Sequence, residues 1–222
     1  MSVQEQLKTI AGTIPSHVTL VAVSKTKPNA AIMEAYEVGQ RDFGENYVQE
    51  LVSKYEALPK DIRWHFIGHL QSNKVKMIAS FVHLIHGVDS AKLLEEINKQ
   101  GAKLGKTIAC LLQIFIAQEE TKFGWSFEEC RNFITSGKLN ELKHVKVAGL
   151  MGMGSNTADA QQLKKEYAGL KTFFDELKLV LPDMNTLSCG MSSDYALAIE
   201  QGSTMVRIGS SIFGEREYKP KG

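Results

Sequence analysis

The sequence has no long hydrophobic run, no basic tract and no leader-like N-terminal segment. No window contains the roughly 18 uncharged apolar residues that a membrane span requires, and residues 1–15 lack a long apolar stretch. The formal net charge is only +1, and lysine and arginine are interspersed among acidic residues, which argues against nucleic-acid binding. We therefore expect a cytoplasmic protein, bound neither to membranes nor to nucleic acid, whose partners are small molecules.

Cysteine is also scarce. Cys110, Cys130 and Cys189 are the three cysteines of the chain, and neither a C-x-x-C pair nor a Cys/His ligand spacing occurs. This pattern predicts neither a disulfide framework nor a structural zinc site. We expect three reduced thiols and no metal.

The chain lacks any Pro/Gly/Ser-rich linker, internal repeat or low-complexity segment. Its 222 residues, 43% hydrophobic and 23% charged, are enough to bury one sizeable core. Because no linker interrupts the pattern, a second domain is not indicated. We expect residues 1–222 to form a single domain.

What the sequence does contain is a repeated alternation of short apolar runs with segments of helical periodicity. This alternation is typical of βα units with buried parallel strands. The expected strands are 18–24, 41–44, 63–68, 82–88, 107–116, 145–151, 185–190 and 205–209. The expected helices are 29–39, 46–57, 72–79, 90–104, 126–137, 158–179 and 192–201, preceded by an amphipathic helix at 3–12.

Eight βα units fit a closed TIM-type (β/α)8 barrel with an extra N-terminal helix. An open doubly wound α/β sheet has nearly the same periodicity, and we favour the barrel by about two to one. In a barrel, the binding site forms at the C-terminal ends of the strands. The residues that follow each apolar run are therefore the candidates for function.

Lys25 stands directly after the first expected strand. Burial at the mouth of a barrel would favour its neutral amine, which can attack an aldehyde. Position alone is weak evidence, because a lysine in a βα loop is more commonly a solvated side chain. Lys25 is thus a candidate for Schiff-base chemistry, with an ordinary surface lysine as the alternative.

The loops after the last two expected strands carry Gly190, Ser192, Gly209 and Ser210. Barrels commonly bind phosphate at these loops through backbone N–H groups and the start of a following helix. Glycine lets the backbone approach an anion closely, and serine adds a hydroxyl donor. For one loop alone, a tight turn with a helix-capping serine is the commoner explanation. Two such loops in the expected places favour a phosphate site.

Other residues near the mouth allow two interpretations each. Arg207 lies within an apolar strand, where its charge needs a ligand or a structural salt bridge. Asn46 either reaches the mouth or caps the next helix, with equal weight. His65 and His69 show no metal-ligand spacing, so we expect supporting or core residues. The methionines near strand ends are expected to serve in packing, namely Met151, Met153 and Met191.

Several motifs in a fixed order resemble a known family. They are VAVSKTKP (21–28), GENYVQE (44–50), WHFIGHLQSNK (64–74), LSCGMSSDY (187–195) and AIEQGSTMVRIGSSIFG (198–214). Together they resemble the pyridoxal phosphate homeostasis proteins, which are related to the barrel domain of alanine racemase. The resemblance spans nearly the whole chain.

The resemblance implies a TIM-type barrel that holds pyridoxal 5'-phosphate (PLP) as a Schiff base on Lys25. The phosphate-binding residues of the family correspond to Ser192, Gly209 and Ser210, with Asn46 close by. On this basis the cofactor is PLP, and these residues are its expected contacts.

By the same resemblance, Arg207 would face the pyridine nitrogen. A guanidinium cannot leave that nitrogen protonated as a carboxylate partner would, so PLP would be a weaker electron sink. The racemase relatives also carry a C-terminal β-domain whose tyrosine is the second acid/base, and no such domain is expected here. The resemblance therefore implies a monomeric protein without a catalytic residue, which buffers PLP or delivers it to PLP-dependent apoenzymes.

Two other functions stay open. A small PLP-dependent racemase or lyase would use Lys25 as base and would need a second acid/base, for which Tyr47 and His69 are the candidates. A barrel without PLP would bind a sugar phosphate through its last two loops. The visible absorption of bound PLP separates this last function from the others.

The chain departs from the usual family pattern at three places. Cys189 stands where methionine is common, Ser210 where threonine is common, and residues 114–125 replace a more polar stretch. Serine keeps the hydroxyl needed for phosphate, and Cys189 is expected to be a buried, inert thiol. The changed 114–125 segment gives no basis for expecting a lid or a partner contact there.

Overall fold

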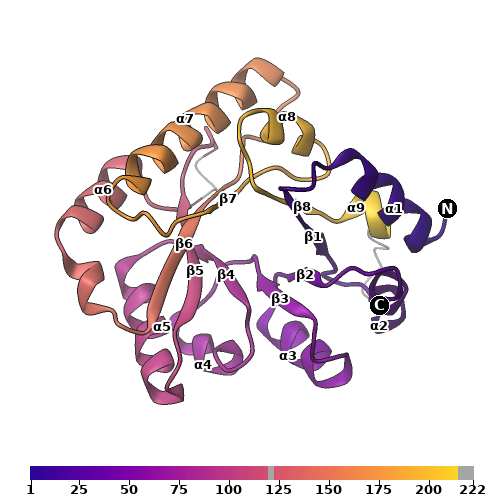
Figure 1. Ribbon diagram of the computed structural model, residues 1–222, viewed down its shortest axis with the longest axis horizontal. Coiled ribbons are helices and arrows are strands. Elements are labelled where there is room, and N and C mark those ends of the chain that lie inside the picture. Colours follow the sequence, from indigo (N-terminus) through magenta and orange to yellow (C-terminus); the bar gives the residue numbers. More distant parts are fainter. Residues whose placement is uncertain (120–122, 215–222) are drawn as a thin grey trace, which may run out of the picture.

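Eight parallel strands form a closed barrel in chain order (Figure 1). The computed structural model describes residues 1–119 and 123–214. The strands are β1 (Thr19–Val23), β2 (Asp42–Glu45), β3 (Arg63–Phe66), β4 (Leu84–Val88), β5 (Ile108–Ile114), β6 (Val145–Gly152), β7 (Thr186–Ser188) and β8 (Met205–Ile208). Because β8 pairs with β1 in parallel, the barrel prediction is confirmed and the open doubly wound sheet is excluded.

Helices follow the strands and surround the barrel (Figure 1). They are α1 (Val3–Thr13), α2 (Asn29–Glu37), α3 (Val48–Ala57), α4 (Val75–Ile78), α5 (Ala91–Leu104), α6 (Phe127–Thr135), α7 (Ala160–Lys178), α8 (Tyr195–Glu200) and α9 (Ser210–Phe213), with 3-10 turns η1 (Ser72–Lys74) and η2 (Lys138–Glu141). Among the described residues, no helix has the length and apolar character that crossing a membrane would require.

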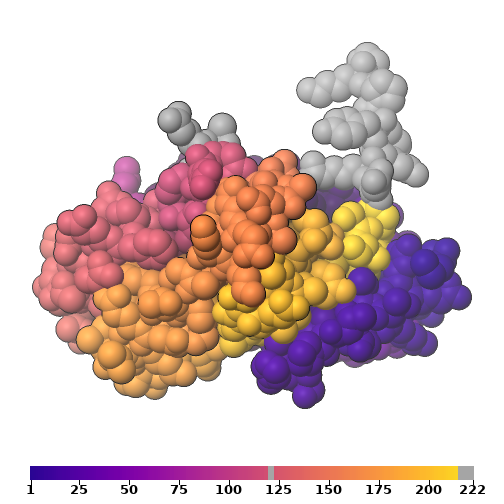
Figure 2. Space-filling model, turned by 90° about the horizontal axis from the view of Figure 1, so that it is seen from above, coloured from indigo at the N-terminus to yellow at the C-terminus, as the bar shows by residue number. Residues whose placement is uncertain are grey.

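Helix α1 is the additional N-terminal helix that the sequence predicts. Its start is stabilised reciprocally, because Ser2 Oγ accepts the N–H of Glu5 and the Glu5 carboxylate accepts the N–H of Ser2. Helix α1 contacts α2 and α9. Together with the pairing of β1 and β8, this contact places the beginning and end of the described chain side by side, as the indigo and yellow surfaces of Figure 2 show.

The hydrophobic core has two parts, because side chains alternate between the two faces of each strand. The larger part includes the fully buried Phe43 and Trp64. Inside the barrel lies a smaller apolar cluster of Val21, Leu84, Leu111, Met151 and Met205. Met151 is therefore a packing residue, as predicted from the sequence.

The segment after β7 differs from the prediction. The sequence predicts a helix over 192–201, but α8 begins only at Tyr195. Gly190 turns the chain with a φ of +95°, which favours glycine, and Asp194 Oδ1 then accepts the N–H of Met191 at 2.6 Å. The backbone between Gly190 and Asp194 is thereby held as a loop at the mouth of the barrel. The short segments η2 and α9 also escaped prediction.

Candidate functional site

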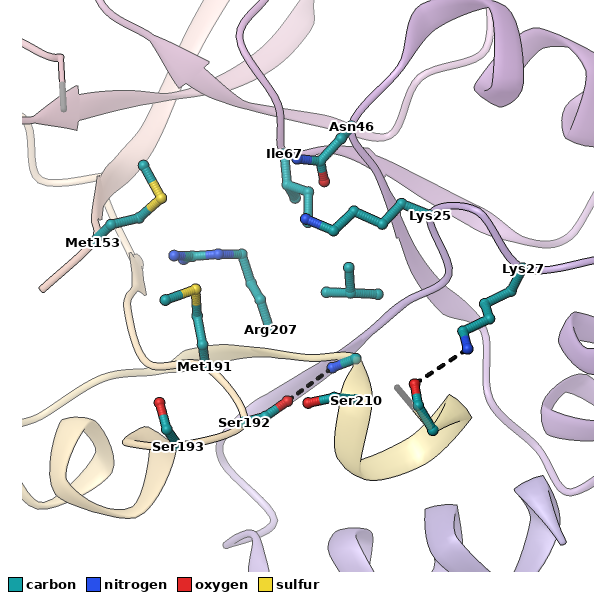
Figure 3. Close-up of a pocket in the computed structure, with 13 residues that line it drawn as sticks. Lys25, Lys27, Asn46, Ile67, Met153, Met191, Ser192, Ser193, Arg207 and Ser210 are labelled. Atoms are coloured by element: carbon teal, nitrogen blue, oxygen red, sulfur yellow. Dashed lines mark hydrogen bonds between the residues drawn. The ribbon is translucent and has the colours of Figure 1, made fainter. Parts of the chain in front are cut away.

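A cavity of about 350 Å³ opens at the C-terminal ends of the strands. All six residues singled out from the sequence line it, namely Lys25, Asn46, Ser192, Arg207, Gly209 and Ser210 (Figure 3). The first two follow β1 and β2, and the other four come from β8 and the loops after β7 and β8. Closure of the barrel brings these two ends of the sequence together around one space.

Lys25 is half-buried and extends into this cavity (Figure 3). The residue after it, Thr26, has a φ of +64° and is the only described non-glycine residue with a positive φ, a conformation that is strained for a β-branched side chain. The N–H of Thr26 donates to Glu50 Oε1 at 2.6 Å. The loop that carries Lys25 is thus held in an unusual conformation by a contact from α3.

Behind this loop lies a buried ion cluster centred on Lys54. Its Nζ donates to the carbonyl oxygen of Ser24 at 2.8 Å, to Glu45 Oε1 at 2.7 Å and to Glu50 Oε1 at 2.7 Å. Ser24 Oγ also donates to Glu45 Oε1, at 2.5 Å. Lys54 therefore ties both neighbours of Lys25 in the chain, Ser24 directly and Thr26 through Glu50.

Glu45 is the least well paired member of this Lys54 cluster. It is fully buried, and its Oε2 has no hydrogen-bond partner among the residues that the structure describes. Desolvation outweighs the attraction of Lys54 and raises the pKa of Glu45 to about 7. The carboxyl group thus changes its charge near neutral pH, just behind the loop of Lys25.

The loops after β7 and β8 are joined at the floor of the cavity. Ser192 Oγ accepts the N–H of Gly209 at 3.2 Å (Figure 3). This contact corrects the alternative of a helix-capping serine, since the N-cap of α8 is Asp194. Asp194 in turn accepts a hydrogen bond from the buried Tyr167 of α7 at 2.7 Å, so the β7 loop is anchored to the outer helix layer.

The loops after β7 and β8 have features of an anion-binding site. Among the described residues, the structure records no acceptor for the backbone N–H groups of Ser192, Ser193, Ser210 and Ser211. A side chain at Gly209 would come within 3.2 Å of Val23 Cβ and the Val23 carbonyl oxygen, so the absence of a side chain lets β8 and β1 approach. Backbone donors are therefore available on the two loops that border the cavity, as phosphate binding requires.

Arg207 is buried and also lines the cavity. Its Nη1 donates to the carbonyl oxygen and Oγ of Ser188, at 2.9 and 2.7 Å, and its Nη2 donates to the carbonyl oxygen of Gly152 at 3.2 Å. Burial lowers the pKa of the guanidinium from its ordinary value. No carboxylate of the described residues forms an ion pair with Arg207, so the structural salt bridge is not observed.

Asn46 lines the cavity and does not cap a helix. The N-cap of α3 is Tyr47, which makes no side-chain capping bond. The Oδ1 atom of Asn46 is buried and has no hydrogen-bond partner in the described part of the chain, which is costly unless a ligand satisfies it. The side chain is therefore available to a bound molecule.

The rest of the lining includes residues that sequence reasoning missed or misassigned. They are Val23, Lys27, Ile67, Met153, Met191, Ser193 and Gly214. Met153 packs against the interior apolar cluster, as predicted, and also lines the cavity, whereas Met191 lines the cavity and is 37% exposed. Lys27 lies two residues after Lys25, but its Nζ donates to the carbonyl oxygens of Phe213 and Gly214 at 2.8 and 3.1 Å. Proximity to the strand ends was the available signal for these residues.

The other sequence candidates lie outside the cavity. Tyr47 is 57% exposed, and His69 pairs with Asp89, with its Nδ1 3.3 Å from Oδ2. Neither side chain belongs to the described lining. His65 is fully buried inside the barrel, as a core or supporting residue should be. Residues 120–122 of the unusual 114–125 segment lie outside the described part of the chain.

The cysteines behave as predicted. Cys110, Cys130 and Cys189 are buried free thiols. Burial raises the pKa of Cys189 to about 11 and those of Cys110 and Cys130 to about 12. Cys189 is therefore an inert thiol near the site.

The parallel barrel and the residues at its mouth can be compared with those of known proteins. The chain matches the family model described as alanine racemase, N-terminal domain, over residues 2–217. The alanine racemase of Clostridium difficile 630 shares this fold, with a TM-score of 0.79, 14% identity and coverage of 98% of this chain and 57% of the racemase. The barrel is thus of the alanine racemase N-terminal class.

Much more similar proteins narrow the class. PipY of Synechococcus elongatus PCC7942 without PLP has a TM-score of 0.91 and 37% identity, covering 96% of this chain and 100% of PipY. With PLP bound, the TM-score is 0.87, with 36% identity and the same coverage. The pyridoxal phosphate homeostasis protein of Vibrio alginolyticus is 41% identical over 212 residues, 93% of this chain and 90% of the relative. That of Escherichia coli K12 is 39% identical over 224 residues, 96% and 92%. This chain belongs to the pyridoxal phosphate homeostasis protein family.

Proposed function

We propose that the chain binds PLP as a Schiff base on Lys25 and takes part in cytoplasmic PLP homeostasis as a buffer or delivery protein. The observation that carries this proposal is the meeting of Lys25, the serine loops and Arg207 in one cavity. A relative at 36% identity, PipY, has been solved with PLP bound. The relatives named pyridoxal phosphate homeostasis proteins support the same role.

The cavity fits the three chemical parts of PLP. The aldehyde would react with the neutral Lys25 amine, forming the carbon–nitrogen double bond with release of water. The phosphate would accept from the Ser192 and Ser210 hydroxyls and from backbone N–H groups around Gly209. The Oδ1 atom of Asn46, which has no partner among the described residues, would accept a hydrogen bond from a ligand or from a water molecule bound with it. These assignments follow from donor chemistry and position in the lining.

Arg207 would lie on the side of the pyridine ring. PLP is a stronger electron sink when its ring nitrogen is protonated, and a guanidinium, which only donates hydrogen bonds, would leave that nitrogen unprotonated. Here the guanidinium is held by carbonyl oxygens and a hydroxyl, with no recorded carboxylate partner among the described residues. We infer that such a site would hold PLP while weakening it as an electron sink for carbanion chemistry.

The racemase or lyase alternative receives less support. It needs a second acid/base opposite Lys25, and its candidates Tyr47 and His69 do not belong to the described cavity lining. We propose a monomer that exchanges PLP with apoenzymes, without substantial turnover of amino acids. Robust racemase or transaminase activity of the purified protein on common amino acids would contradict this part of the proposal.

The test is the visible absorption of the wild type, Lys25→Ala and Lys27→Ala, each incubated with PLP and desalted. Lys27→Ala is the matched control, because Lys27 lines the same cavity but donates to backbone carbonyls. We expect a protonated-imine band in the wild type and in Lys27→Ala, and none in Lys25→Ala. Colourless wild-type protein would instead favour a barrel that binds a sugar phosphate.

A further inference from the structure

A chain of hydrogen-bonded side chains crosses the inside of the barrel from the cavity. It links Arg207 on β8 through Ser188 on β7, His86 on β4 and His65 on β3 to Asp42 on β2. The successive distances are 2.7 Å from Nη1 to Oγ, 3.1 Å from Oγ to Nδ1, 2.9 Å from Nε2 to Nδ1, and 3.0 Å from Nε2 to Oδ1. Asp42 is the first residue of its strand, so the chain ends at the opposite end of the barrel. We call it the interior chain.

The two ends of the interior chain have fixed roles. Arg207 can only donate hydrogen bonds. At the other end, burial by itself raises the pKa of Asp42, but hydrogen bonds from His65 and Arg63 outweigh it and hold the pKa well below its ordinary range. Asp42 is therefore a carboxylate that only accepts, and the proton between it and His65 belongs to His65 Nε2.

The groups between the ends then follow. Ser188 Oγ accepts from Arg207, and its only other partner recorded among the described residues is His86 Nδ1. The buried hydroxyl proton pairs only if it is donated to Nδ1, since an unpaired buried donor is costly. Burial, together with repulsion from Arg207, lowers the pKa of His86 well below its usual value, so the ring carries one proton.

That single proton of His86 must be on Nε2, because Nδ1 accepts from Ser188. It is donated to His65 Nδ1, which must then be unprotonated. Both imidazoles are thus neutral Nε2–H tautomers, and all four hydrogen bonds run from Arg207 towards Asp42. Reversing any one of them leaves a buried hydroxyl proton unpaired or sets two donors against each other.

We propose that Ser188, His86, His65 and Asp42 are positioning residues for Arg207, and that their one-way chain couples the orientation of its guanidinium to the carboxylate at the far end of the barrel. Ser188 holds Nη1 at the wall with its hydroxyl and carbonyl oxygens. Together with the bond from Nη2 to the Gly152 carbonyl oxygen, this fixes the direction of the planar fork at the cavity wall. That the guanidinium meets the ring of PLP rests on the proposed function, whereas the chain itself does not.

A metal site is the competing explanation for part of this cluster. Asp42, His65 and His83 offer ligand atoms that lie within 4.8 Å of one another. A metal would have to displace Arg63, which donates to both carboxylate oxygens of Asp42, and to remove the proton of His65 Nε2. The interior chain accounts for these groups with every proton paired, so we assign Asp42 and His65 to it.

The direct test is the tautomeric state of the histidines in 15N-labelled protein without PLP, by long-range 1H–15N correlation. Signals are assigned through single His→Gln variants among the six histidines of the chain. We expect His65 and His86 as neutral Nε2–H tautomers at pH 7. An Nδ1–H tautomer or an imidazolium at either position would overturn the proposal.

A variant tests the coupling to the far end. In Asp42→Asn, the amide can donate as well as accept, so the direction of the chain is no longer imposed and Nδ1–H signal should appear at His65. His83→Gln is the matched control, because the His83 ring packs 5.3 Å from that of His65 without belonging to the chain. Unchanged tautomers in Asp42→Asn would show that Asp42 does not set the direction.

PLP binding provides the second readout. Ser188→Ala removes the hydroxyl that holds Nη1, and we expect PLP affinity to fall about tenfold. The pKa of the imine, measured from the pH dependence of the visible absorption, should shift as well. His83→Gln should bind PLP within about twofold of wild type. Wild-type affinity and band in Ser188→Ala would contradict the positioning role. If wild-type protein binds no PLP, the proposed function fails, and the tautomers still decide on the interior chain.

Discussion

Two buried polar networks of the barrel, the Lys54 cluster and the interior chain, differ in how completely their groups are paired. The interior chain joins donors to acceptors in one direction from Arg207 to Asp42. The Lys54 cluster sets one ammonium against two carboxylates and leaves Glu45 Oε2 without a partner. The interior chain holds the positive charge of Arg207 at the cavity. The Lys54 cluster contains one more carboxylate than it has cations.

The incompletely paired Lys54 cluster lies beside the loop that carries Lys25. The Lys54 cluster holds the loop of Lys25, in which Thr26 has a φ of +64°. Strained backbone persists only where the surroundings impose it, and here Glu50 and Lys54 do so. The comparison teaches that the Lys25 side of the cavity depends on a strained loop held by buried ions, whereas the Arg207 side depends on the two imidazoles of the interior chain.

Breaking the Lys54 cluster should have the largest effect. Lys54→Met leaves two carboxylates without their buried cation, and we expect a loss of about 3–5 kcal/mol in the free energy of unfolding. PLP affinity should fall as well, because Ser24 and Thr26 lose their common anchor. Urea denaturation measures the first effect, with the exposed Lys164→Met as a matched control. A loss below about 1 kcal/mol would show that the Lys54 cluster stabilises the fold no more than an exposed ion pair does.

Glu45 gives the comparison a pH dependence. Its folded-state pKa of about 7 lies above the ordinary value of 4.5, so the folded state binds the extra proton between these values. Its contribution to stability is fully present below pH 4.5 and is lost as pH rises through about 7. In Glu45→Gln, relative to wild type, the free energy of unfolding should rise by about 1–3 kcal/mol from pH 5 to pH 8.

Denaturation at several pH values checks this expectation. The exposed Glu200→Gln serves as the control and should follow the wild-type pH profile. Parallel profiles for Glu45→Gln and wild type would mean that Glu45 keeps one charge state throughout, and the contrast between the two networks would then disappear.

The smallest effect is expected beside the interior chain. His83 contacts the ring of His65, but the residue is exposed, and the partial desolvation of its ring lowers its pKa. His83→Gln should change the free energy of unfolding by less than about 0.5 kcal/mol, as measured by urea denaturation. A larger loss would place His83 within the network and reopen the question of a metal at Asp42.

The sequence predicts the barrel and its mouth because both depend on local pattern. Apolar runs mark the strands to within a few residues, and Lys25 and Ser210 stand where such runs stop. Ser192 was misplaced as a possible cap, because a loop held by Asp194 and Gly190 looks like the start of a helix. Helix periodicity alone does not show where the first turn begins.

The buried networks could not be predicted in the same way. His86 and Ser188 lie in apolar runs and gain their role only when β4 and β7 face each other across the closed barrel. Lys54 looks like an ordinary helical lysine until α3 packs behind β1 and β2. Polar residues at positions that face into the barrel were the one available signal, and they do not identify their partners.

The central claim is the bond between PLP and Lys25. Borohydride reduction of the wild-type protein after incubation with PLP, followed by peptide mass mapping, locates that bond directly. The account predicts the reduced adduct on Lys25, with Lys27 and Lys54 unmodified. An adduct confined to another lysine, or no adduct at all, would contradict it.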